Sequence, residues 1–226
     1  MLPLKSMNTD EPLPTRASLL GRLKDAGDDA SWEEFHRTYR GLLVGVARRA
    51  GLNEHEAEEA VQETLIAVAK KMPEFCYEPG KDSFKGWLLR IVRWKIVDQV
   101  RRRREAVGPD VADEEPSSVA ERLALTEDRK LDSAILLANV ADPRQDFDAI
   151  WDAEWERHLL TQALARVKRL AKPEHYAVYH LHVIEERPVA EVRHTLGASA
   201  ASVYLAKHRV GALVKQAVQR LQASEQ

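Results

Sequence analysis

Residues 84–104 read FKGWLLRIVRWKIVDQVRRRR, and this stretch decides the fold. Its apolar residues recur at helical spacing along one face; they are Trp87, Leu88, Ile91, Ile96 or Val97, and Val100. Arg90, Arg93 and Lys95 alternate with that face, and residues 101–104 are all arginine. A helix that buries one side and presents cations and an indole on the other suits a phosphate backbone and unstacked bases. The alternative is a solvated amphipathic helix whose basic end complements the helix dipole.

The segments before this helix also predict helices, because strand-like alternation is absent and glycine and proline rarely interrupt long stretches. A first helix is expected to begin at a cap within residues 29–31 and to stop at Gly51. A second is expected from Asn53 to about Met72. Residues 73–83, PEFCYEPGKDS, are typical of a loop. We therefore predict an all-α fold.

The C-terminal half of the chain predicts further helices, from about residue 147 to residue 170 and over residues 174–184. A helix-turn-helix is expected over residues 188–221, where Gly197 permits a positive φ at the turn and Ser199 is a good cap. Early residues of the second helix have the chemistry to meet base edges and phosphates; they are Tyr204, Lys207, His208 and Arg209. The alternative is an ordinary helical hairpin.

The charge of the chain is unevenly distributed. The net charge is −2, but residues 105–156 hold 15 acidic and 4 basic residues, a balance of −11. The rest of the chain therefore carries +9, which is −2 minus −11. Residues 105–118, EAVGPDVADEEPSS, are acidic and interrupted by proline, so they predict a linker. Two basic ends around an acidic middle indicate nucleic-acid contact at the ends.

Composition and motifs exclude several other classes. Apolar residues make up 44% of the chain, yet no run of 18 or more occurs and the N-terminus lacks a signal-peptide pattern, so we expect a cytoplasmic protein without membrane contact. Cys76 is the single cysteine, which excludes an internal disulfide and a thiolate zinc site. His55 and Glu56 begin an HExxH-like pattern whose second histidine is missing. We expect no metal, no cofactor and no enzymatic activity.

Three segments together resemble bacterial RNA polymerase sigma factors of the extracytoplasmic-function (ECF) group. Residues 54–65, EHEAEEAVQETL, resemble an acidic helix of that group, residues 84–103 its basic helix, and residues 163–221 its C-terminal helix-turn-helix. The resemblance covers about two thirds of the chain and is strongest in the first half.

The resemblance implies two helical domains joined by an acidic linker. It divides the chain into a flexible N-terminus (1–16), a sigma region 2-like domain (17–104), an acidic linker (105–146) and a sigma region 4-like domain (147–226). The first domain would bind core RNA polymerase and melt the minus-ten promoter element. The second would read the minus-thirty-five element. Core polymerase and promoter DNA are the implied partners, an anti-sigma protein is a candidate third partner, and the free chain is expected to be a monomer.

The resemblance also implies a role for individual residues. The expected polymerase contacts are Glu59, Gln62 and Glu63. The expected minus-ten contacts are Arg90, Arg93, Trp94, Lys95, Asp98 and Arg101, with Tyr77 and Lys81 in a loop that traps a flipped base. The expected minus-thirty-five contacts are Ser199, Ser202, Tyr204, Lys207, His208 and Arg209.

The sequence departs from the family pattern at three positions. Trp94 stands where asparagine is common, Arg193 where alanine allows the two helices of the helix-turn-helix to touch, and Lys207 where leucine is common. Arg193 must extend outward to keep that packing. The alternative function is a helix-turn-helix regulator that binds duplex DNA without polymerase, and the acidic helix before the basic helix favours the sigma factor.

Overall fold

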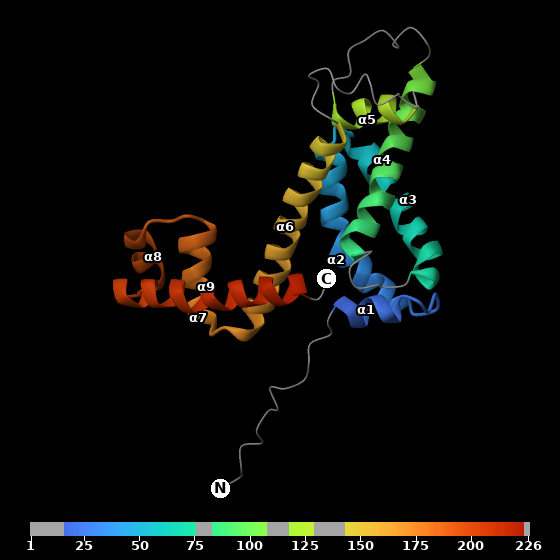
Figure 1. Cartoon of the computed structure of the whole chain (residues 1–226). Helices are drawn as coiled ribbons and strands as arrows, with labels where there is room; N and C mark the ends of the chain where they lie inside the picture. The colour runs from blue at the N-terminus through green and yellow to red at the C-terminus, as the bar shows by residue number, and fades with distance from the viewer. Residues whose placement is uncertain (1–15, 76–82, 108–117, 129–142, 224–226) are drawn as a thin grey trace.

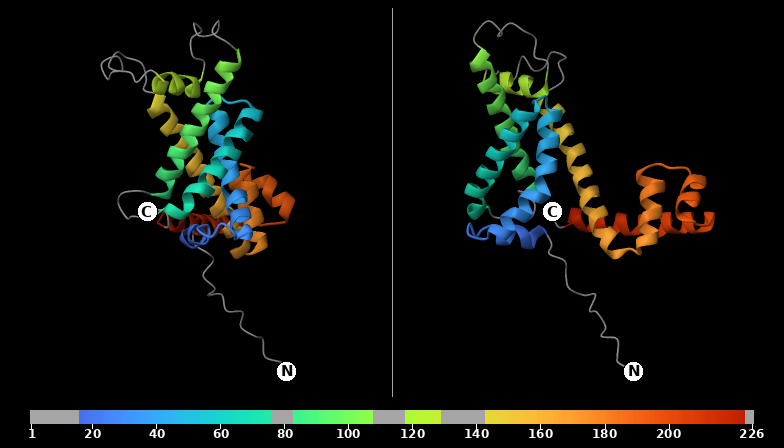
Figure 2. Two further views of the ribbon diagram at one scale, coloured as in Figure 1. Left: turned by 90° about the vertical axis from the view of Figure 1, so that its right-hand side faces the viewer. Right: turned by 180° about the vertical axis from the view of Figure 1, so that it is seen from behind.

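The computed structural model describes residues 16–75, 83–107, 118–128 and 143–223, and these residues contain helices but no strand. The predicted all-α fold is therefore confirmed. Helices α1–α6 pack together, and α7, α8 and α9 gather at the far end of α6 (Figures 1 and 2). No helix within the described ranges combines the length and the apolarity needed to cross a membrane.

Interactions between residues close in sequence determine where the first helices begin. Helix α1 spans Arg16–Arg22 and α2 spans Asp29–Arg49. The cap of α2 is Asp28, one residue before the predicted range, and its carboxylate accepts a hydrogen bond from the Ser31 backbone N–H at 3.1 Å. Hydrogen bonds from the Ser31 hydroxyl and N–H lower the pKa of Asp28.

Helix α3 spans Glu54–Lys71 and begins where the sequence predicts, at Asn53. Asn53 and Glu56 form a capping box in which each side chain accepts a hydrogen bond from the other residue's backbone N–H. A 3₁₀ turn, Met72–Glu74, follows and contains the proline that ends the helix.

Helix α4 spans Phe84–Val107 and continues three residues past the predicted end. Of its predicted inward residues, Trp87 is half-buried and the others are buried. Ile96 and Val97, which the sequence offered as alternatives, are both fully buried. Both face inward because α4 packs against α3 and also against α5.

The segment expected to be a linker contains helix α5, Val119–Asp128. Its start is fixed by a capping box between Ser118 and Glu121, and the Ala120 N–H donates to the Ala50 carbonyl at 2.9 Å. Gly51 permits this approach, because it has a φ of +106° and a Cβ there would lie 2.2 Å from the Ser118 Cβ. Residues 119–124 thus belong to the first packed unit, while residues 108–117 and 129–142 lie outside the described ranges.

Helix α6 spans Pro143–Leu170 and joins two hydrophobic cores. Phe147, Trp151, Trp155 and Leu159 are buried in the core that α1–α5 also form. From Ala163, about one turn later, its buried residues belong to a second core, shared with α9. The boundary expected at residue 147 therefore falls inside the first core. The two tryptophans are packing residues, as their four-residue spacing indicates.

The C-terminal helices form the predicted helix-turn-helix. Helix α7 spans Pro173–Tyr179, a π-helical turn covers His180–Ile184, α8 spans Val189–Leu196 and α9 spans Ala200–Ala223. Gly197 has a φ of +63° at the turn, and the Ser199 hydroxyl accepts from the Ser202 N–H at 3.1 Å. Val192 of α8 is buried, whereas Leu196 at the end of the same helix is 40% exposed. Arg193 is exposed to solvent, so the buried Val192 makes the contact between α8 and α9 in its place.

Candidate nucleic-acid interface

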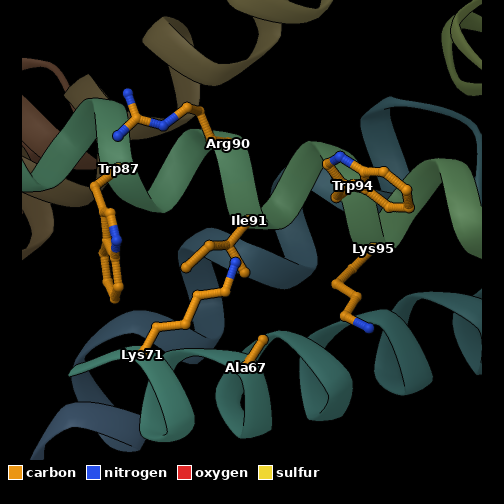
Figure 3. A pocket seen from close by; sticks show the side chains of 7 residues that line it. All are labelled: Ala67, Lys71, Trp87, Arg90, Ile91, Trp94 and Lys95. Carbon is orange, nitrogen blue, oxygen red and sulfur yellow. The ribbon is translucent and has the colours of Figure 1, made fainter. Parts of the chain in front are cut away.

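A groove of about 550 Å³ runs between α3 and α4. Its lining residues are Ala67, Lys71, Trp87, Arg90, Ile91, Trp94 and Lys95. Figure 3 shows Trp87, Ile91 and Lys95 pointing from α4 toward α3, while Lys71 reaches back from α3. A second hollow of about 230 Å³ adjoins it and shares Ala67, Lys71 and Lys95. The two together make a surface with an apolar floor and a cationic border.

The two tryptophans of the groove have different surroundings. Trp87 is half-buried and packs against Phe75 and Phe84, with ring centroids 4.7 and 5.7 Å apart. Trp94 is 60% exposed, and the Arg101 guanidinium lies 5.6 Å from the centre of its ring. An exposed indole beside cations suits an unstacked base whose phosphates need neutralising.

Glu63 connects the acidic helix to the basic helix. Its carboxylate accepts from Lys95 at 3.2 Å and from Arg102 at 2.5 Å, and Arg102 also pairs with Asp98 at 2.8 Å. Partial burial acts to raise the pKa of Glu63, but the hydrogen bonds from Arg102 and Lys95 outweigh it, so that pKa is lowered. Glu63, an expected polymerase contact, and Lys95, an expected DNA contact, therefore bind each other. Glu59 is exposed.

Gln62 is exposed as well, so two of the three expected polymerase residues, Gln62 and Glu59, face solvent on α3. Ala57, Val61 and Val68 occupy the buried side of the same helix. The polar face predicted for polymerase contact is thus presented outward.

Arg93 faces α6, although the sequence predicts a DNA contact. Its guanidinium pairs with Asp148 and lies 5.3 Å from the centre of the Phe147 ring, and its side chain is only 21% exposed. The partner is 55 residues away in the chain, so the spacing of α4 alone gives no sign of it.

The structure brings four of the expected minus-ten residues to one side of α4: Arg90, Trp94, Lys95 and Arg101. Asp98 pairs with Arg102 beside them. Sequence reasoning missed Lys71, which it treated as the end of a helix, and it placed Trp87 only in the core. The Lys70-Lys71 pair at the end of α3 was the available signal. Tyr77 and Lys81 lie outside the described residues.

The expected minus-thirty-five residues lie at the start of α9 and before it. Tyr204, Lys207, His208 and Arg209 are exposed, whereas Val203, Ala206 and Val210 hold the opposite face in the core. The hydroxyls of Ser199 and Ser202 lie 2.8 Å apart within the cap. Four side chains are thus presented to solvent together, and their role in DNA reading stays a prediction.

Residues 35–106, which contain the groove, match the family model of sigma-70 region 2. This chain carries a sigma-70 region 2 domain. It is 36% identical over 90 residues to the ECF RNA polymerase sigma factor SigE of Mycolicibacterium smegmatis, which covers 40% of this chain and 34% of that protein. It is 25% identical over 94 residues to the ECF RNA polymerase sigma factor RpoE of Cereibacter sphaeroides, which covers 42% and 51%.

The predicted resemblance to ECF sigma factors is therefore confirmed over this region, and the matched part spans about a third to a half of these relatives. A solved structure, "Structure of CnrH in complex with the cytosolic domain of CnrY", aligns over 88% of this chain and 93% of that chain at 20% identity. Its TM-score of 0.32 is too low to establish a shared overall arrangement.

Proposed function

We propose that this chain is a sigma factor that binds core RNA polymerase and directs promoter-specific initiation. The observation that carries the proposal is the groove between α3 and α4, because it lies within the sigma-70 region 2 match and combines two indoles with three cations. Cations and aromatic faces are the two features that single-stranded DNA sites combine. Core polymerase and promoter DNA are then the partners, and the cytoplasm is the place of action.

In this proposal, α4 holds the melted minus-ten element. Arg90 and Arg101 neutralise backbone phosphates, and Trp94 stacks on a base that has left the duplex. Extracting a base costs a few kcal/mol. Stacking on an aromatic side chain returns about 1–3 kcal/mol per base. Lys71 and Lys95 lie at the edges of the groove, and their positive charges attract the phosphates of the DNA strand.

The polymerase contact is proposed for the exposed side of α3, at Glu59 and Gln62. Glu63 contributes through its ion pairs, because it holds Lys95 and Arg102 of α4 against α3. Polymerase bound at α3 would therefore influence, through these ion pairs, the position of α4, the helix proposed to hold DNA.

The second DNA contact is proposed for α9. Tyr204, Lys207, His208 and Arg209 would meet the minus-thirty-five element, as early residues of a recognition helix do in other helix-turn-helix proteins. The chain itself performs no chemistry in this scheme, since polymerase supplies the catalysis.

Run-off transcription with purified core polymerase on genomic fragments tests the proposal. We expect discrete transcripts that need this chain, and co-purification of the chain with core enzyme. A Gln62→Lys, Glu59→Lys variant should keep its helical content and lose core binding, because both residues are exposed. Ile66→Lys, at an exposed position one turn further along α3, is a positional control for added charge. Tight binding to duplex DNA without polymerase, together with no initiation, would instead support the regulator.

A further inference from the structure

The N-terminal half of α6 carries four carboxylates that pair with cations on three other helices. The pairs are Asp146 with Arg122 of α5, Asp148 with Arg93 of α4, Asp152 with Lys85 of α4, and Glu154 with Arg49 of α2. Along α6 the partners on α4 run in reverse order, so the two helices are antiparallel where these pairs form. We call these four residues the α6 carboxylates.

Packing fixes the position of the α6 carboxylates. Trp151 and Trp155 are buried against each other with ring centroids 5.3 Å apart. Glu154 lies directly over Gly45 of α2, where a Cβ would come within 2.5 Å of its carboxylate oxygen. The α6 register therefore depends on burial and on the missing side chain at Gly45. The carboxylates of Asp148 and Asp152 are consequently held beside α4.

Four of the cations of α4 fall into two pairs as a result. Arg90 and Arg101 lie on the side with Trp94 and the groove. Lys85 and Arg93 lie on the side of α6, where carboxylates neutralise them. The side chains of Asp148 and Asp152 are 50% and 61% exposed and those of Arg93 and Lys85 are 21% and 32% exposed, so each pair lies at the surface with its carboxylate open to solvent. Ion pairs this exposed add little to stability, and an exchange of partners leaves the core intact.

We propose that Lys85 and Arg93 form a second phosphate-binding face of α4, and that the carboxylates of Asp148 and Asp152 occupy it in the free chain. The ligand is a nucleic-acid backbone, because its phosphates are anions that can replace these carboxylates as partners of Lys85 and Arg93. The carboxylates of Asp148 and Asp152 then lower the affinity of the free chain for DNA. This inference rests on the proposed function of α4, and it assigns the masking of this basic surface to two acidic residues of α6.

The test is the binding of a fluorescent single-stranded oligonucleotide to the full chain across a salt series. Asp148→Asn with Asp152→Asn keeps side-chain size and removes both charges. We expect tighter binding and a salt slope steeper by about 1.4, which is about 0.7 for each of two cations on a single strand. Adding Lys85→Gln and Arg93→Gln to this variant should return the slope to that of the parent chain.

The matched control is Glu156→Gln with Glu174→Gln, because both are exposed and neither forms an ion pair within the described ranges. An equal gain in this control would overturn the inference, since overall charge would then explain it. An unchanged slope in the Asp148, Asp152 variant would also overturn it, and normal initiation by the parent chain would leave the proposed function standing. If the double variant loses helical content, Asp152→Asn alone carries the test with half the expected change.

Discussion

Among the described residues, the large first core and the two small C-terminal clusters are built from different residues. The first core holds the large side chains that are fully buried, including Phe35, Tyr39, Phe84, Trp151 and Trp155. The second core and its neighbour under the helix-turn-helix consist mainly of valine and alanine. Buried apolar area sets most of the stability. The first core should therefore be the more stable, and the C-terminal clusters should undergo local unfolding more readily. The more stable part thus contains the groove on α4, and the less stable part contains α9.

Truncating a tryptophan in the first core should have the largest effect on stability. Trp151→Ala removes a side chain that is 1% exposed, and such changes cost about 3–5 kcal/mol. Urea unfolding followed by circular dichroism measures the loss. Leu160→Ala, at an exposed position on the same helix, should change the free energy of unfolding little. A loss for Trp151→Ala no larger than that of Leu160→Ala would mean that α6 is not part of the first core.

Truncation in the C-terminal core should cost less and act locally. Val203→Ala removes two buried methylene equivalents, worth about 1.6 kcal/mol. We expect faster amide hydrogen exchange in α8 and α9, with unchanged exchange in α2–α4. Leu205→Ala, at an exposed position two residues on, is the control. Faster exchange spreading into α2–α4 would show that the two cores unfold as one.

The smallest expected effect is a pH dependence from Glu63. Its pKa is lower in the folded chain than the ordinary value of 4.5, so its contribution to stability is present above that value. The contribution disappears as pH falls through the folded pKa. We expect Glu63→Gln to flatten the decline in stability below about pH 4.5 relative to the parent chain. Thermal melts at closely spaced pH values would show it, and identical slopes for both chains would contradict this account of Glu63.

The elements of the fold were predictable where their signals are local. Asn53 and Glu56 mark the start of α3, and Gly197 with Ser199 marks the turn before α9. The apolar face of α6 was also readable from its spacing. Which core that face enters was not, because the contact of Trp151 with the first core joins segments far apart in the chain.

The residues of the candidate site were largely predictable from the sequence, but the ion pairs that they form were not. The basic helix gave Arg90, Trp94 and Arg101, which the structure leaves on its outer side. Arg93 read as an equivalent cation, yet it pairs with Asp148 across 55 residues. Lys71 became part of the groove only through the packing of α3 on α4. Charge patterns along one helix identify the ions, and tertiary contacts decide which partners they have.

Permanganate footprinting of the polymerase complex tests the central claim, that α4 and its groove hold melted DNA. The chain offers a matched pair of exposed aromatics, since Trp94 on α4 is 60% exposed and Tyr204 on α9 is 59% exposed. On a promoter with a strong minus-ten element, Trp94→Ala should strongly reduce thymine reactivity in the melted region, because a stacked base is worth about 1–3 kcal/mol. Tyr204→Ala should leave most of that reactivity. Equal loss in both variants, or unchanged reactivity with Trp94→Ala, would contradict the account.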